Sequence, residues 1–171
     1  MRTKISLLFL MFNLFIWAQD TNNLDTKYGF NKFKLETPLS QLKSFCKYLS
    51  SFEGTDMYRY TGSQIDGIFG YFNVKTLNLY FYKGKLQEIE IIFGSLTVEN
   101  NEYINRKLLG LYGYPQKQMP TDEFYEFCNV WLGQKTTLLF QNARERLSFP
   151  SDASIRVISQ KITKQQENDK F

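Results

Sequence analysis

The pair of chemical groups that first suggests a reaction in this sequence is Glu88 and Glu90, which are separated by one residue. In an extended strand such residues share a face about 7 Å apart, a separation close to that of the two carboxyl groups of a glycosidase. A glycosidase pair flanks a cleft, whereas these two lie on one strand. A solvated strand face is therefore the favoured interpretation, and a carboxylate-based hydrolase is an alternative.

The residue types exclude most other catalytic chemistry. The chain has 171 residues, no histidine and two cysteines, so His-assisted nucleophiles and His-containing or four-cysteine metal sites are ruled out. We expect no catalytic residue, no metal site and no cofactor. Cys46 and Cys128 can form one disulfide, which an exported chain could keep, or remain two buried thiols.

The first residues predict export. Arg2 and Lys4 precede a mainly apolar run that ends at Trp17 and is followed by Ala18, the pattern of a secretory signal peptide over residues 1–18. Removing it lowers the excess of basic over acidic groups from four to two, too little to indicate nucleic acid. No cysteine stands near the cut, so we expect a periplasmic or secreted protein without a direct membrane anchor.

The remaining chain is long enough for one domain. Residues 19–28 are polar and are expected to form a flexible lead-in. Residues 29–162 are expected to form a single α+β domain, and residues 163–171 a polar tail.

Two segments have the spacing of helices. Pro38 to Ser51 follows a Thr-Pro start and places Leu39, Leu42 and Leu49 at helical intervals. Residues 97–112 repeat the pattern, with Thr97 as a cap, Ile104, Leu108 and Leu111 as the apolar stripe, and a glycine and a proline beyond the end.

The strongest strand signal is a hairpin within residues 71–93. A three-residue loop, Lys83 to Lys85, would pair Leu79 with Ile89, whereas a one-residue slip would exchange the two faces. Further strands are expected at residues 57–61, 124–132, 135–141 and 153–162. The register of the Phe124–Gln141 hairpin stays open, because both of its faces carry apolar residues.

Together these segments predict an α+β fold: an antiparallel β-sheet with two helices packed on one face. A loose match between Thr76–Phe81 and Thr136–Phe140 suggests a duplicated helix-plus-hairpin unit. The other sheet face would then be open.

That open face is the candidate binding surface. Aromatic residues make up 17% of the chain, and aromatic rings on an open face can hold a partner protein. Half-buried strand positions are the competing explanation. The hairpin register assigns five residues to this face, and Trp131 joins them in one of the two registers of its strand: Asn78, Tyr80, Tyr82, Glu88, Glu90 and Trp131.

Two short stretches carry a family resemblance. Residues 35–42, Leu-Glu-Thr-Pro-Leu-Ser-Gln-Leu, and residues 109–115 resemble small envelope modules of the SmpA/BamE outer-membrane assembly lipoprotein type. That fold overlaps the β-lactamase-inhibitor-protein type, which duplicates a helix-plus-hairpin unit. The chain has Glu36 where the family has glycine, and it lacks the lipid-bearing cysteine. The resemblance implies a non-catalytic binding or assembly role.

The function expected from the sequence is a small exported binding or protein-interaction module of the bacterial cell envelope. Its partner would be another envelope or secreted protein. A structural subunit of a larger envelope complex and a carboxylate-based hydrolase are the alternatives.

Overall fold

The fold of the protein is described by a computed structural model, which defines residues 21–62, 74–119, 125–143 and 152–170. Half of these residues lie in strands. The helical segments are α2 (Thr21–Lys27), α3 (Leu39–Leu42), the 3-10 turn η1 (Lys43–Phe45), α4 (Val98–Tyr112) and α5 (Gln160–Asn168). The strands are β1 (Gly29–Phe30), β2 (Phe33–Lys34), β3 (Cys46–Phe52), β4 (Thr55–Tyr60), β5 (Val74–Tyr82), β6 (Lys85–Ser95), β7 (Lys117–Met119), β8 (Tyr125–Leu132), β9 (Thr136–Ala143) and β10 (Asp152–Ser159).

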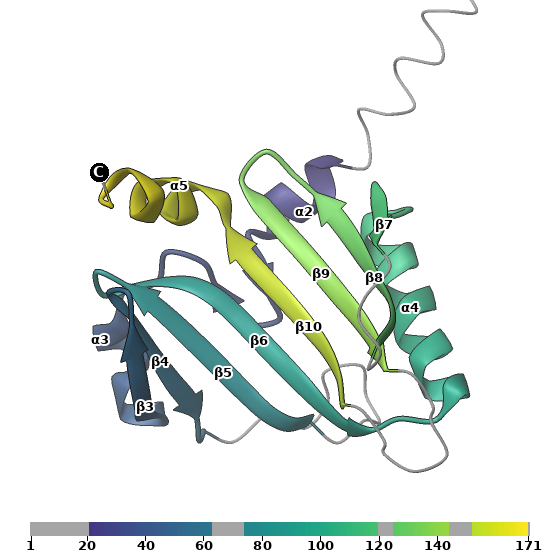
Figure 1. The fold of residues 1–171 in the computed structure, drawn as a ribbon, viewed down its shortest axis with the longest axis horizontal. Coiled ribbons are helices and arrows are strands. Elements are labelled where there is room, and N and C mark those ends of the chain that lie inside the picture. Colours follow the sequence, from purple (N-terminus) through teal and green to yellow (C-terminus); the bar gives the residue numbers. More distant parts are fainter. Residues whose placement is uncertain (1–20, 63–73, 120–124, 144–151, 171) are drawn as a thin grey trace, which may run out of the picture.

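Eight of the described strands form one antiparallel sheet in the order β3-β4-β5-β6-β10-β9-β8-β7, as Figure 1 shows. The last strand along the chain, β10, is inserted between β6 and β9 and so joins two halves of the sheet. A separate hairpin, β1-β2, precedes the sheet in sequence.

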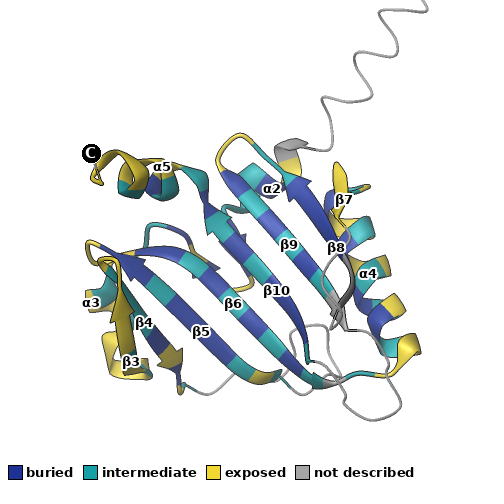
Figure 2. Cartoon of the chain, viewed as in Figure 1, coloured by how far each residue is buried: buried dark blue, intermediate teal, exposed yellow. Residues whose placement is uncertain are grey.

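The core lies along one face of this sheet. The strand register places one row of apolar side chains across seven strands: Tyr48, Tyr58, Leu79, Ile89, Val157, Leu138 and Trp131. Figure 2 shows the resulting alternation of buried and half-buried positions along β5, β6, β9 and β10. Such alternation follows from the two-residue period of a strand.

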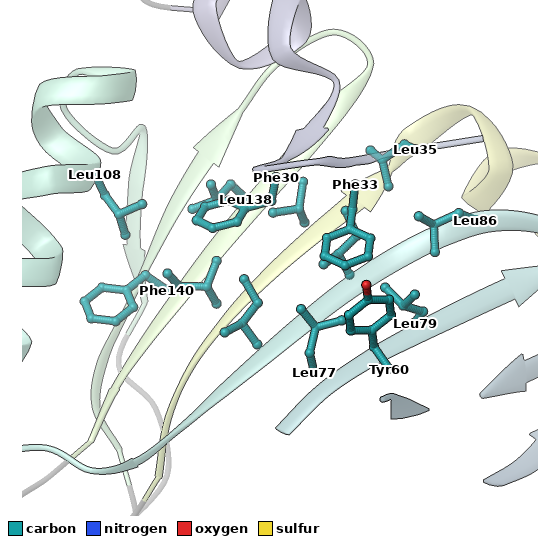
Figure 3. Packing of buried hydrophobic residues seen from close by; sticks show 14 of the residues in the cluster. Phe30, Phe33, Leu35, Tyr60, Leu77, Leu79, Leu86, Leu108, Leu138 and Phe140 are labelled. Atoms are coloured by element: carbon teal, nitrogen blue, oxygen red, sulfur yellow. The ribbon is translucent and has the colours of Figure 1, made fainter. Parts of the chain in front are cut away.

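The core face is covered by two segments that are far apart in the sequence. Phe30, Phe33 and Leu35, around the β1-β2 hairpin, are buried in the cluster, with Phe30 near Leu138 and Leu35 toward Leu86 (Figure 3). Ile104 and Leu108 of α4 join the same cluster, and Leu108 lies on the side of Phe140 (Figure 3). The apolar face of the sheet is therefore buried by side chains from distant parts of the sequence.

The helix expected at residues 97–112 is confirmed as α4. The Thr97 hydroxyl accepts a hydrogen bond from the Asn100 amide at the start of the helix, and Gly113 ends it with a φ of 74°. Positive φ is a conformation that glycine adopts without strain. Ile104 and Leu108 are buried as expected, but Tyr112 takes the place predicted for Leu111.

The pairing predicted for the β5-β6 hairpin is also confirmed, with Leu79 opposite Ile89 and Leu77 opposite Ile91. The loop differs from the expectation. Lys83 and Gly84, both with positive φ, form a two-residue turn, and the register shifts by one residue at Gln87, in β6. A β-bulge there supplies the extra residue that was assigned to the loop.

The expected α+β fold with two helices packed on one face is wrong, because the described protein is mainly β. The segment expected as helix 38–51 contains only the four-residue α3 and the turn η1 before it becomes β3. Without that helix, the predicted duplication of a helix-plus-hairpin unit is also wrong. Leu39 and Leu42 do pack against the core, so the helical spacing was real for one turn and accidental beyond it.

Both ends of the described chain contain helices. The lead-in 19–28 contains α2, whose Leu24 is buried in the core. The polar tail 163–171 lies largely in α5, which follows β10 directly. The signal peptide expected at 1–18 falls outside the described residues.

Asp25 of α2 fixes the turn between β8 and β9. Its two carboxylate oxygens accept hydrogen bonds from the backbone N–H groups of Gln134, Lys135 and Thr136 at 2.6, 2.9 and 3.0 Å. Gly133 makes this approach possible, since a Cβ atom there would lie 2.2 Å from Oδ1 of Asp25. The N-terminal helix is thus attached to the far half of the sheet by a charged hydrogen-bond set.

We predict that Asp25→Ala lowers the free energy of unfolding by about 2 kcal/mol or more, because three donors lose a charged acceptor. Denaturant unfolding followed by tryptophan fluorescence measures this. The matched control is Glu167→Ala on the exposed side of α5, which should change stability by no more than about 0.5 kcal/mol. Equal effects of the two variants would contradict the structural role assigned to Asp25.

Candidate protein-interaction surfaces

The sheet face opposite the core carries a charged row. Across neighbouring strands the register places Arg59, Asn78, Glu90, Arg156 and Leu139 side by side. The next row contains Tyr80 and Glu88. Four of the predicted candidates, Asn78, Tyr80, Glu88 and Glu90, are therefore brought together as expected. Arg156 of β10, which lies beside Glu90 on the next strand, was not predicted to belong to this face.

Glu88 is held by Arg156. The Arg156 guanidinium donates from Nε to Oε1 at 2.6 Å and from Nη2 to Oε2 at 3.0 Å. The Glu88 side chain is 12% exposed and that of Arg156 is 38% exposed. Two parallel charged hydrogen bonds in a half-buried position make a stronger pair than a surface contact. Both charges therefore serve to join β6 to β10.

Glu90 is held by donors from β5, on the side of β6 away from β10. Its Oε2 atom accepts hydrogen bonds from Asn78 Nδ2 at 2.8 Å and from the Tyr80 hydroxyl at 2.7 Å. Burial raises the pKa of Tyr80, and the hydrogen bond to Glu90 raises it further. Tyr80 therefore stays a protonated donor at neutral pH. The two carboxylates are both occupied by neighbouring donors, which is the arrangement of a structural network.

Tyr82 and Trp131 are placed differently from the expectation. Tyr82 is buried, and its hydroxyl donates to Asp169 at 2.7 Å, just beyond the end of α5, while Lys83 forms an ion pair with the same carboxylate. Trp131 is 1% exposed on the core face, where its Nε1 donates to the Gly113 carbonyl at 2.9 Å. Trp131 therefore leaves the candidate set, and the binding face cannot include it.

The two cysteines are free thiols. Cys46 belongs to β3 and Cys128 to β8, six strand positions apart in the sheet order. With about 4.8 Å between neighbouring strands, their separation far exceeds the 7 Å limit between Cα atoms of a disulfide. Burial raises the pKa of both thiols. The alternative of two thiols that behave as small apolar groups therefore describes them.

The surface that the sequence did not predict is the outer strand β3. Phe45, Tyr48 and Phe52 are 50%, 52% and 76% exposed, and Figure 2 shows β3 as a mainly exposed strand. Tyr48 packs edge-on against the buried ring of Tyr58 at 5.4 Å. Phe45 lies beside Tyr60 with a centroid distance of 6.4 Å. The spacing of these three aromatic residues is that of a helix, and for this reason the segment was predicted to be helical rather than an exposed strand.

Comparison with known proteins adds little. No protein-family model matches the chain, and a search of curated proteins returns no significant match. One similar solved structure is a cysteine-rich secretory protein from Staphylococcus aureus, with 8% sequence identity and a TM-score of 0.42. The match covers 80% of this chain and 50% of that protein. The resemblance to SmpA/BamE-type modules stays a prediction.

Two findings limit the kinds of site among the described residues. No group of three or more potential metal ligands occurs in the described part of the chain. Within the same ranges, no helix combines the length and the apolar character needed to cross a membrane.

We predict that Arg156→Ala lowers the free energy of unfolding by about 2–3 kcal/mol, because Glu88 is left half-buried without its charged donor. Arg59→Ala is the matched control, since Arg59 is exposed in the same row. Adding Glu88→Gln to Arg156→Ala should restore part of the loss. Urea unfolding of the unaltered chain, Arg156→Ala, Glu88→Gln and the double variant measures the coupling, and additive effects would contradict the pairing.

We also predict two titratable thiols per chain when mature protein is prepared without reductant and then denatured. Before denaturation, alkylation by iodoacetamide should be slower than for a free cysteine, because burial holds both thiols in the protonated form. Mass spectrometry after alkylation gives the count. A mass two hydrogens lower with no alkylation would show a disulfide instead.

Proposed function

We propose that this chain is a small exported, non-catalytic protein-interaction module of the bacterial cell envelope. Export is supported by the basic start and apolar run of residues 1–18. The partner would be another envelope or secreted protein. The interaction is assigned to the aromatic edge, defined as Phe45, Tyr48 and Phe52 with the β3 strand that carries two of them.

The aromatic edge is the observation that carries the proposal. Large apolar side chains that are half exposed or more are common singly on any surface, but three within eight consecutive residues of η1 and β3 concentrate apolar surface at one edge of the sheet. Tyr48 and Phe45 are also held by buried rings beneath them. A rigid aromatic side chain loses little conformational entropy on binding, which is why such residues dominate interface energetics.

An enzymatic role has less support from the described residues. The carboxylates of Glu88 and Glu90 are each engaged by neighbouring donors. A hollow of about 600 Å³ lies between α5 and the β8-β9 turn, but its lining has one acidic residue, Asp169, and three lysines, Lys135, Lys161 and Lys164. Asp169 is already paired with Lys83. A hydrolase would need two carboxyl groups converging on a substrate.

We predict that Phe45→Ser with Tyr48→Ser abolishes partner capture. Tagged mature protein beginning at Gln19 would be cross-linked in its own cell envelope and purified, and bound proteins would be quantified by mass spectrometry. Losing two aromatic anchors should reduce the recovery of a direct partner by about tenfold or more.

The matched control is Val98→Ser with Tyr114→Ser, which removes two exposed apolar side chains at the ends of α4. This control should retain the partner. Thermal unfolding of both variants checks that each remains folded. Recovery of the same proteins with both variants, or of none with the unaltered chain, would refute the proposed function.

A further inference from the structure

The geometry points to strand addition as the way a partner binds: an extended segment of another protein pairs with the free edge of β3. We further infer that this segment carries acidic residues on one face and apolar residues on the other. The inference rests on the proposed function and specifies the partner's chemistry at the same aromatic edge.

The backbone of β3 is available for pairing. β3 stands first in the sheet order and pairs only with β4 among the described strands. Its seven residues therefore present a row of N–H and C=O groups on the side away from β4. The opposite edge is formed by β7, which has three residues. A peptide that adds a strand gains main-chain hydrogen bonds along the longer edge.

One face of this edge carries two neighbouring basic side chains. Lys47 of β3 lies directly opposite Arg59 of β4, and both side chains are exposed. Like charges in directly opposite positions destabilise a strand pair. No carboxylate of the described residues forms an ion pair with either of them. The nearest acid along the same row is Glu90, which already accepts hydrogen bonds from Asn78 and Tyr80.

An acidic side chain on an added strand would relieve this repulsion. Neighbouring residues of a strand point to opposite faces, so Lys47 lies on the face of Arg59 while Tyr48 lies on the face of Tyr58. A partner strand would place its acidic residues beside Lys47 and its apolar residues beside Tyr48. Over Cys46–Tyr48 the alternation of the partner sequence would follow that of β3. Beyond Tyr48 a bulge shifts the register by one residue and places Phe52 on the face of Lys47.

The same charges disfavour a second copy of this chain as the occupant. Antiparallel pairing of two β3 strands about Leu49 would set Tyr48 opposite Ser50 and Lys47 opposite Ser51. It would also bring a second copy of Lys47 and Arg59 into the same sheet. Lysine on an edge strand is a common protection against self-association. A chain of different sequence and opposite charge fits better.

The test is a selection from a display library of random ten-residue peptides on the immobilised mature protein. Enriched peptides are expected to alternate acidic and apolar residues. Their affinity is then measured by fluorescence anisotropy with synthetic peptides in solution. Reversing the charges with Lys47→Glu and Arg59→Glu should weaken binding about tenfold or more. Selection on that variant should enrich basic peptides instead.

Two controls separate strand addition from general attraction to a basic surface. The variant Lys135→Glu with Lys164→Glu reverses two exposed lysines around the α5 hollow and should leave peptide affinity unchanged. A selected peptide with alternate backbone nitrogens methylated cannot donate to β3 and should bind about tenfold more weakly. Equal effects at both lysine pairs, or full binding by the methylated peptide, would overturn the proposal.

The outcomes also distinguish this inference from the function on which it rests. If cross-linking loses its partner in the Phe45 and Tyr48 variant but no alternating acidic peptide is enriched, the interaction function stands and strand addition fails. Dimerisation of the unaltered chain in sedimentation experiments, lost on Tyr48→Ser, would likewise overturn it in favour of a second copy. If the cross-linking finds no partner, the proposed function itself fails.

Discussion

The rest of the structure depends on the two-residue period of one broad antiparallel sheet. Because each strand places alternate side chains on opposite faces, the registers collect a row that runs from Trp131 to Tyr48 on the core face. They collect the Glu88, Glu90 and Arg156 network on the other. A slip of one residue in any central strand would exchange the two sets. The bulge at Gln87 matters for this reason, since it lets the short Lys83-Gly84 turn coexist with the correct pairing of Leu79 and Ile89.

The two halves of this wide sheet are also joined by hydrogen bonds and ion pairs outside the strands, between segments that are far apart in sequence. Asp25 binds the β8-β9 turn. Glu36, two residues beyond β2, accepts a hydrogen bond from Tyr28 and forms an ion pair with Lys161 of α5. The Lys161 and Tyr28 hydrogen bonds lower the pKa of Glu36. Glu36 therefore stabilises the fold when it is ionised, and this contribution is lost as the pH falls through its lowered pKa. Both termini of the described chain thus belong to the folded unit.

Local sequence patterns predicted the secondary structure correctly wherever a segment has one buried face. Helix α4 buries one face, and its cap at Thr97 and its stripe of Ile104 and Leu108 were predicted correctly. The alternation around Leu79 likewise predicted the correct pairing of β5 with β6. β3 has no fully buried face, so its apolar residues follow no strand period and were read as a helix. The face of Trp131 was undecided for the opposite reason, because both sides of β8 carry buried residues. Its position is set by Gly113 and by Leu138, which are non-local partners that no window of sequence contains.

The same reasoning supports the proposal that the aromatic edge is a surface for recognition. The core row ends at Tyr48, a ring that rests on Tyr58, which in turn rests on Phe81. Each inner ring is covered by the next strand outward, and Tyr48 is the first that no described strand covers, with 52% of its surface exposed. Burying that remaining area would gain hydrophobic free energy without rearranging the core. The sheet therefore ends at β3, where one more strand of suitable charge would extend the apolar row that ends at Tyr48 and the charged row that ends at Lys47.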